Sequence, residues 1–264
     1  ILQEGRVFKE KEDIEIASFL TATLAWGKRE QIIINAKKLM EWMDYSPYQF
    51  ISNHTVRDLE VFNKFYYRTF NGVDCVFFLQ TLKNLYQNHN GLQGSFHSTN
   101  DNEFSIKEAI GNFRNLFFKL PHIQRTQKHV SDPARNSSCK RLNLFLRWMV
   151  RKDSRGVDFG LWDHIKPSEL ICPLDVHTSR VARKLGLLKV KQNNWYAAIE
   201  LTNNLKEFDP DDPTCVMRIR AEPHSTLYRV RVTNRTDATI SDVQVMLTDL
   251  EPRAVQYLPA PLLF

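Results

Sequence analysis

The chain has 264 residues and a formal net charge of +6, and 42% of its residues are hydrophobic while 25% are charged. This is the composition of an ordinary soluble globular protein that can bury a substantial core. No apolar run approaches the ~20 residues of a membrane-spanning helix, and the charged residues at 9–13 exclude a signal peptide. We therefore expect a cytoplasmic protein that does not enter a membrane.

The N-terminal part of the chain carries helical periodicity almost throughout. Ser46 followed by Pro47 predicts the start of a short helix. The polar stretch 88–103 holds most of the turn-forming residues and predicts a surface loop. The longer helices that apolar spacing predicts here are 14–26, 30–43, 55–66 and 73–88.

The middle of the chain also predicts helices, separated by the turn 131–141 and by an irregular segment at 156–163. Asn193 or Asn194 is the expected cap of the last helix. The predicted helices are 104–119, 121–130, 142–150, one from Val176, and 194–208.

The character of the sequence changes after 209–213. Residues 228–234 and 241–249 alternate apolar and polar side chains, which predicts a β-hairpin, with a third strand around 216–221. The fold class is therefore mainly α: a helical domain at 1–213 and a small β-rich tail at 214–264. Because the chain begins with Ile1 rather than methionine, we expect the helical domain to be truncated at its N-terminus.

The four cysteines, at 75, 139, 172 and 215, are too scattered for a paired metal-binding motif or an iron–sulfur cluster. No set of His, Cys, Asp and Glu has metal-ligand spacing, and no glycine-rich loop is suited to a phosphate. We expect free thiols and neither a metal nor a cofactor.

Positive charge is concentrated between Arg114 and Arg155, where eleven lysines and arginines stand against two acidic residues, Asp132 and Asp153. This segment carries +9, so the rest of the chain carries −3. Such a concentration suits a polyanion, most commonly a nucleic acid. The alternative is a solvated basic surface without a partner.

Lys140 stands where a polar turn meets the buried helix 142–150. Partial burial and the neighbouring Arg141 favour a neutral amine, which can attack an electrophilic carbon and form a Schiff base. The alternative is a lysine that begins a helix and binds solvent or phosphate. Asp175 precedes the helical pattern of 176–188 and is a preferred N-cap. The same N–H bonds would keep the acid ionised and suit it to stabilise positive charge.

Aromatic and basic residues near these two positions are further candidates. Phe145, Trp148 and Trp162 could form a base pocket, although aromatic residues at helical spacing are more often core. Arg147 and Arg151 lie four positions apart on one helix face, which favours a shared anion. The other basic residues considered as phosphate contacts are Lys152 and Arg155.

Residues 173–187, PLDVHTSRVARKLGL, resemble the helix-hairpin-helix DNA glycosylase superfamily, and most closely its archaeal oxidised-guanine glycosylases. The resemblance implies that Asp175 is the catalytic acid and that Lys140, thirty-five positions earlier, is the nucleophile. It also implies DNA contacts at the turn of Trp26, Gly27, Lys28 and Arg29. The other residues predicted to contact DNA are Arg141, Arg147, Arg151, His177 and Arg180, and the predicted base pocket is Phe145 and Trp148.

Residues 1–213 also resemble a bacterial family known only as a domain of unknown function, through AWGKRE and KRLNLFLRWMVRKD. Three features depart from the glycosylase pattern. The hairpin turn reads NSSCK instead of Gly-x-Gly, the iron–sulfur cysteines are missing, and the segment after residue 213 resembles a foreign or incomplete immunoglobulin-like fragment.

The resemblance implies a monomeric base-excision repair enzyme that acts on double-stranded DNA and is associated with the nucleoid when bound. Lys140 would attack C1′ of the sugar, and the Schiff base could proceed to cleavage at the abasic site. Two alternatives stay open: a glycosylase-like scaffold that binds DNA without chemistry, and a helical scaffold for protein partners.

Overall fold

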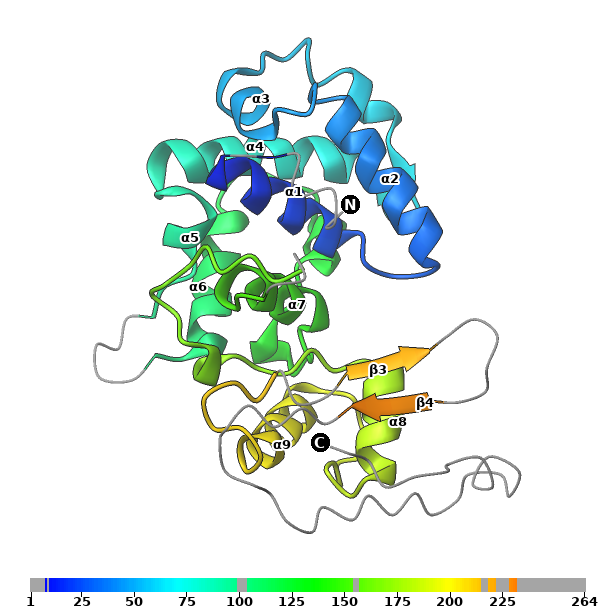
Figure 1. Ribbon diagram of the computed structural model, residues 1–264. Coiled ribbons are helices and arrows are strands. Elements are labelled where there is room, and N and C mark those ends of the chain that lie inside the picture. The colour runs from blue at the N-terminus through cyan, green and yellow to red at the C-terminus, as the bar shows by residue number, and fades with distance from the viewer. Residues whose placement is uncertain are drawn as a thin grey trace.

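A computed structural model describes residues 8, 10–98, 104–153 and 157–214, together with the backbone of the strands at 218–221 and 228–231. Helices make up most of the described part (Figure 1). The α-helices are α1 (Lys11–Thr23), α2 (Arg29–Glu41), α3 (Pro47–Asn53), α4 (Gly72–Asn88), α5 (Gly91–Ser95), α6 (Ile106–Phe117), α7 (Lys140–Val150), α8 (Val176–Lys184) and α9 (Trp195–Lys206).

Short elements connect these helices. The 3-10 helices are η2 (Val61–Lys64), η3 (Gln124–His129), η4 (Pro133–Arg135) and η5 (Pro167–Glu169). Strands β1 (Tyr66–Tyr67) and β2 (Phe70–Asn71) form one antiparallel pair, and β3 (Arg218–Ala221) and β4 (Tyr228–Arg231) form another. In the second pair Arg218 lies opposite Arg231 and Ala221 lies opposite Tyr228.

Helix α1 is the centre of the larger hydrophobic core. Its sequence is apolar on nearly every face, and every residue from Glu15 to Thr23 is buried. The ring of Phe19 lies 5.5–6.0 Å from the rings of Phe78, Phe113, Phe117 and Phe145. Aromatic side chains from α4, α6 and α7 therefore converge on α1, which fixes the position of α7 in the fold.

A second, smaller core lies between α8 and α9, at the lower end of the molecule in Figure 1. Its eight buried residues are Cys172, Leu174, Ala182, Leu188, Ala197, Ala198, Leu201 and Leu205. Ile171 packs against both cores. The segment that leads into α8 is thus held by the smaller core, while α7 is held by the larger one.

The prediction of a mainly helical chain is confirmed, and most helices lie within a few residues of their predicted ranges. The helix predicted at 55–66 is wrong, because only Val61–Lys64 is helical and its geometry is 3-10. The helix predicted at 121–130 is likewise the 3-10 helix η3. The predicted surface loop 88–103 contains the short helix α5, whose entry residue Asn90 is left-handed at φ 54°.

The predicted β-rich tail is described only in part. Residues 228–231 pair with 218–221, so the strand expected around 216–221 is the partner seen, while 241–249 lies outside the described residues. Among the described helices, none combines the length and the apolarity that crossing a bilayer demands.

Candidate functional site

Lys140 and Asp175, which are far apart in the sequence, meet in the fold. The Nζ atom of Lys140 lies 3.0 Å from Oδ2 of Asp175. The two side chains are 36% and 28% exposed, so the pair is open to a ligand on one side. Lys140 is the first residue of α7, and Asp175 is the N-cap of α8. The predicted pairing of an amine with an acid is therefore present in the structure.

The turn 136–139 before α7 explains why this lysine faces the acid. Asn136 and Cys139 both adopt left-handed conformations, with φ of 60° and 49°, which reverse the chain direction. The Asn136 carbonyl accepts the N–H of Trp195 at 3.2 Å, and the Ser138 hydroxyl donates to the Leu174 carbonyl at 3.5 Å. These contacts fix the turn against the start of α9 and the residue before Asp175.

The surroundings of Asp175 favour its ionised form. Partial burial opposes ionisation, but the N–H of Thr178 donates to Oδ1 at 2.8 Å, and Lys140 lies beside Oδ2. Together these contacts lower the pKa of Asp175 from its ordinary value. The acid is thus both a helix cap and a fixed negative charge next to a primary amine, as the sequence predicted.

The thiols near the pair are poor nucleophiles. Cys139 and Cys172 are buried, and burial raises the pKa of each thiol to about 12. Cys75 is also a buried free thiol, while Cys215 lies outside the described residues. Lys140 is therefore a better candidate nucleophile than the cysteine beside it.

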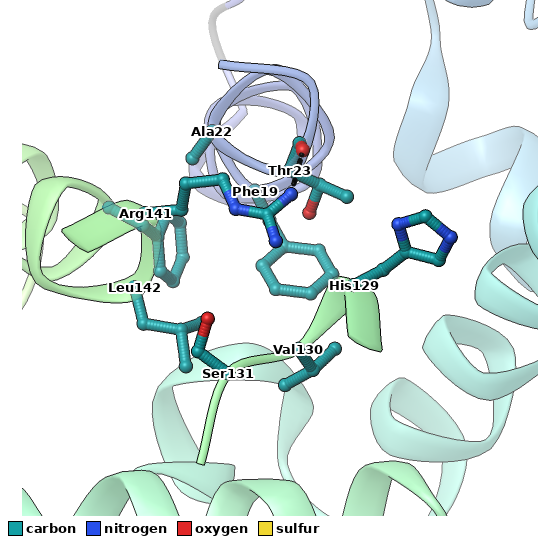
Figure 2. Close-up of a pocket in the computed structure, with 9 residues that line it drawn as sticks. Phe19, Ala22, Thr23, His129, Val130, Ser131, Arg141 and Leu142 are labelled. Atoms are coloured by element: carbon teal, nitrogen blue, oxygen red, sulfur yellow. Dashed lines mark hydrogen bonds between the residues drawn. The ribbon is translucent and has the colours of Figure 1, made fainter. Parts of the chain in front are cut away.

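The turn at 26–29 lies next to α7, as Arg141 shows. Arg141 donates from Nη1 to the Thr23 carbonyl at 2.7 Å, and its guanidinium stacks 4.9 Å from the centre of the Trp26 ring (Figure 2 draws the hydrogen bond). Burial lowers the pKa of Arg141 to about 10. The prediction that Arg141 contacts DNA is wrong in this structure, because its guanidinium fastens α7 to α1.

Trp26 is held in the same way. Its ring lies 5.5 Å from Tyr67 and stacks 6.1 Å from His129, besides its contact with Arg141. The sequence predicts a DNA contact at Trp26, but three side chains of the chain itself already pack against its ring. Gly27, Lys28 and Arg29 are exposed, as the prediction requires. Gly27 has φ 105°, which a residue with a Cβ rarely adopts.

Arg147 and Arg151 share an anion, but it belongs to the chain itself. Arg147 Nη2 and Arg151 Nη1 lie 3.2 Å and 2.5 Å from the same Oδ2 atom of Asp158, which is fully buried. Arg151 also binds Asp212 at 2.7 Å and is only 4% exposed. The prediction that these two arginines bind DNA phosphates is therefore corrected. Lys152 is exposed, and Arg155 lies outside the described residues.

The predicted base pocket is also corrected. Phe145 is 0% and Trp148 is 6% exposed, and both belong to the larger core. Trp162 is buried as well, and its Nε1–H donates to Glu15 at 2.7 Å. Phe145 does line a hollow with Phe19, His129 and Arg141 (Figure 2), but its volume of about 10 Å³ suits one water molecule rather than a base.

Asp74 forms a buried polar cluster that the sequence reasoning missed. Its carboxylate accepts hydrogen bonds from Thr126 Oγ1 at 2.7 Å, Arg125 Nη1 at 3.0 Å and His129 Nε2 at 3.2 Å. Asp74 also completes a capping box with Asn71 at the start of α4. The sequence signal was Asn71 followed three positions later by an acid, a pattern that predicts a helix start but not the long-range partners.

His129 gives the fold a dependence on pH. Burial outweighs the nearby Asp74 and lowers the pKa of His129 to about 4, from an unfolded value near 6.5. The folded protein then keeps His129 neutral while the unfolded chain takes up a proton, so stability is full above about pH 6.5 and is lost as pH falls toward 4. We expect His129 to remove up to about 3 kcal/mol of unfolding free energy across this window, measured by urea denaturation.

His129→Gln should flatten the loss of stability between about pH 6.5 and 4.5, because the variant has no imidazole at this buried position. Equal slopes in His129→Gln and the unaltered chain would contradict the assignment.

His177 and Arg180 are exposed on α8, on the solvent side of the helix that Asp175 caps. Both side chains are therefore accessible to a ligand, and their contact with DNA stays a prediction. Among the described residues, no group of three or more His, Cys, Asp or Glu side chains is placed to hold a metal ion.

Comparisons with known proteins complete the description. Searches of curated proteins and of solved structures found no match. A family model described as "Protein of unknown function (DUF2400)" matches residues 2–216. This match covers the whole helical part, including Lys140 and Asp175, and agrees with the unknown-function family expected from AWGKRE and KRLNLFLRWMVRKD. The chain therefore belongs to the DUF2400 family.

Proposed function

We propose that this protein is a DNA glycosylase with abasic-site lyase activity, in which Lys140 is the nucleophile and Asp175 the assisting acid. The observation that carries the proposal is the 3.0 Å pair between Nζ of Lys140 and Oδ2 of Asp175. The two groups come from the starts of different helices and remain partly exposed. An amine next to a fixed carboxylate is suited to Schiff-base chemistry at an electrophilic carbon.

The chemistry begins with a proton transfer. The ion-paired amine must lose a proton before it can attack, and the Asp175 carboxylate lies within hydrogen-bond reach of it. The nitrogen lone pair then attacks C1′ of the deoxyribose, and the bond from C1′ to the damaged base breaks with its electrons leaving on the base. The departing base takes up the proton that Asp175 accepted, and the carboxylate that is thereby restored stabilises the positive charge at the sugar.

The lyase step follows from the same covalent intermediate. Opening of the sugar ring gives an iminium between Nζ and C1′. Loss of a C2′ proton then expels the 3′ phosphate, and water releases the lysine. A target base inside a duplex has to be flipped out of the stack first, at a cost of a few kcal/mol. We propose the exposed turn of Gly27, Lys28 and Arg29 as the part of the chain that meets the DNA there.

The local backbone supports a glycosylase-like helical body. Helix η4 and helix α7 are joined by the short turn 136–139, and Asp175 caps the helix that meets this turn. The turn lacks glycine, but Asn136 and Cys139 adopt the left-handed conformations that glycine would otherwise provide. We propose that this unit is a helix-hairpin-helix in which NSSCK replaces the usual Gly-x-Gly.

Trapping with borohydride tests the function directly. The chain is mixed with duplex DNA that carries one abasic site or one oxidised guanine, and borohydride reduces any iminium to a stable amine. We expect an adduct with the unaltered protein and none with Lys140→Arg, because arginine keeps the cation beside Asp175 but cannot form the Schiff base. Denaturing gels measure the adduct.

The matched control is Lys128→Ala, which removes an exposed lysine on η3 without touching the pair. It should give the same adduct yield as the unaltered chain. No adduct with the unaltered protein on either substrate, or an undiminished adduct in Lys140→Arg, would refute the proposal.

A DNA-binding scaffold without catalysis is the second candidate. The observation that favours it is the small size of the hollow lined by Phe145, about 10 Å³, which cannot accept a base. On this alternative the pair of Lys140 with Asp175 holds two helices together. Lys140→Arg would then keep full affinity for DNA, and no adduct would form with any variant.

A further inference from the structure

We infer that a basic groove along α8 binds the backbone phosphates of the DNA strand engaged at Lys140 and Asp175. This inference rests on the proposed function of that pair. The groove is open, with a volume of about 530 Å³. The groove residues that carry the argument are Ser179, Arg180, Arg183, Lys184, Lys191 and Asn193.

The groove is cationic and contains no acid among the residues that line it. Arg180, Lys184 and Lys191 are exposed, and none of the three forms an ion pair with any carboxylate in the described part of the chain. Unpaired cations gathered on one concave surface attract a polyanion, with phosphate as the natural partner.

The arginines of the segment 114–155 behave in the opposite way. Arg125 is bound to Asp74, while Arg147 and Arg151 are bound to Asp158. Arg114 binds Asp132, and Arg141 donates to a backbone carbonyl. These five of the eleven cations at 114–155 thus have partners within the chain, which makes the unpaired cations of the α8 groove a candidate surface for an external anion.

Arg183 builds the wall of the groove. Its Nε and Nη2 atoms donate to the Val190 carbonyl at 3.0 Å and 2.8 Å. Nη2 also donates to the Lys191 carbonyl at 2.7 Å and to Oδ1 of Asn193 at 2.8 Å. These bonds hold the segment 190–193 against α8, so Lys191 faces Arg180 and Lys184 across the groove before any ligand binds.

The acid Glu200 contacts the segment that forms the groove wall. Glu200 on α9 accepts the backbone N–H groups of Lys189 and Val190 at 2.9 Å and 3.0 Å. Both carboxylate oxygens of Glu200 therefore accept hydrogen bonds from the backbone of the wall. Charge in the groove is left positive, which is the condition for binding phosphate.

The groove begins at the helix that carries the acid of the candidate catalytic pair. Its lining includes Val176, Ser179, Arg180 and Arg183 of α8, and Asp175 is the N-cap of the same helix. The seven steps from Val176 to Arg183 span about 10 Å at the rise of an α-helix. At about 3.4 Å per nucleotide along a strand, this corresponds to about three nucleotides beside the reacting one.

The experiment compares two triple variants with the same charge change. The groove variant is Arg180→Gln with Lys184→Gln and Lys191→Gln, which leaves Arg183 to hold the wall. The control variant is Arg57→Gln with Lys64→Gln and Lys107→Gln, three exposed cations on other elements. Fluorescence anisotropy measures Kd for duplex DNA with a central abasic site between 50 and 200 mM salt, roughly the range over which phosphate contacts dominate.

We expect the groove variant to bind roughly 10- to 100-fold more weakly and its log–log salt slope to fall by about 2 to 3. The control variant should change the slope by less than one unit. Thermal unfolding of both variants is recorded, because Lys184 also lies in the last turn of α8, where a cation favours the helix dipole. A groove variant that keeps the unaltered slope, or a control variant that loses as much, would overturn the inference.

The outcome is separable from that of the proposed chemistry. Borohydride trapping of the unaltered chain tests the reaction at Lys140 and Asp175, whereas the salt slope of the groove variant tests the groove alone. If the unaltered chain forms no adduct but shows the groove-dependent salt slope, the catalytic proposal fails and the groove inference stands. If adduct forms while the groove variant binds as the unaltered chain does, the groove inference fails alone.

Discussion

Replacing Asp74 with alanine should lower the free energy of unfolding by about 3–5 kcal/mol, the usual cost of removing one partner from a buried ionic network. The carboxylate is 0% exposed and accepts from Thr126, Arg125 and His129, and from the N–H of Asn71 at 3.1 Å. Without it, three donors from η3 and the N–H of Asn71 lose their acceptor together. Urea denaturation followed by circular dichroism measures the change.

The control for Asp74 is Asp58, an acid that also accepts local bonds but lies at the surface. Asp58 Oδ2 accepts from the N–H and hydroxyl of Thr55 at 2.7 Å and 2.8 Å. Asp58→Ala should reduce stability far less, because water replaces an exposed acceptor. Similar losses of unfolding free energy in Asp74→Ala and Asp58→Ala would contradict a large stabilising contribution from the buried Asp74 cluster.

Replacing Asp158 with alanine is expected to have a comparable effect, again about 3–5 kcal/mol. The carboxylate neutralises Arg147 and Arg151 at the C-terminal end of α7, and Arg151 is 4% exposed. Burial raises the pKa of Asp158 despite these arginines, and the loss of Asp158 removes the one carboxylate oxygen that both arginines contact. Urea denaturation of Asp158→Ala measures the loss.

A double-mutant cycle separates the pair from its surroundings. The combination of Arg151→Met with Asp158→Leu should destabilise less than the sum of the two single changes, because both members of the ion pair between Arg151 and Asp158 are then removed together. A strictly additive double variant would contradict direct coupling between the two side chains.

Periodicity predicted the helices well where apolar side chains face one core. The helix from Lys140 to Val150 and the cap at Asp175 followed from local pattern alone. The range 55–66 failed, because its apolar residues lie in a 3-10 helix followed by the short strand of Tyr66 and Tyr67. Local spacing does not distinguish these geometries when tertiary packing decides between them.

Charge was harder to predict than helix position. The sequence shows eleven cations between Arg114 and Arg155 but not which acids reach them. Asp74 lies far upstream and Asp212 far downstream of the arginines they bind. Only the fold brings these pairs together, which is why a stretch that reads as a basic surface contains Arg151 as a buried residue.

The lysine and the acid belong to different packing units. Lys140 begins a helix anchored by the larger core, whereas Asp175 follows a segment whose Cys172 N–H is held by Thr202 of α9 at 2.9 Å. The geometry of the pair therefore depends on how firmly eight residues of the smaller core support that segment. Loosening α9 would separate the Lys140 amine from the Asp175 carboxylate, while the larger core around α1 stayed folded. Loss of activity in a variant with an intact helical spectrum would then be traced to support of the acid rather than to the reacting groups.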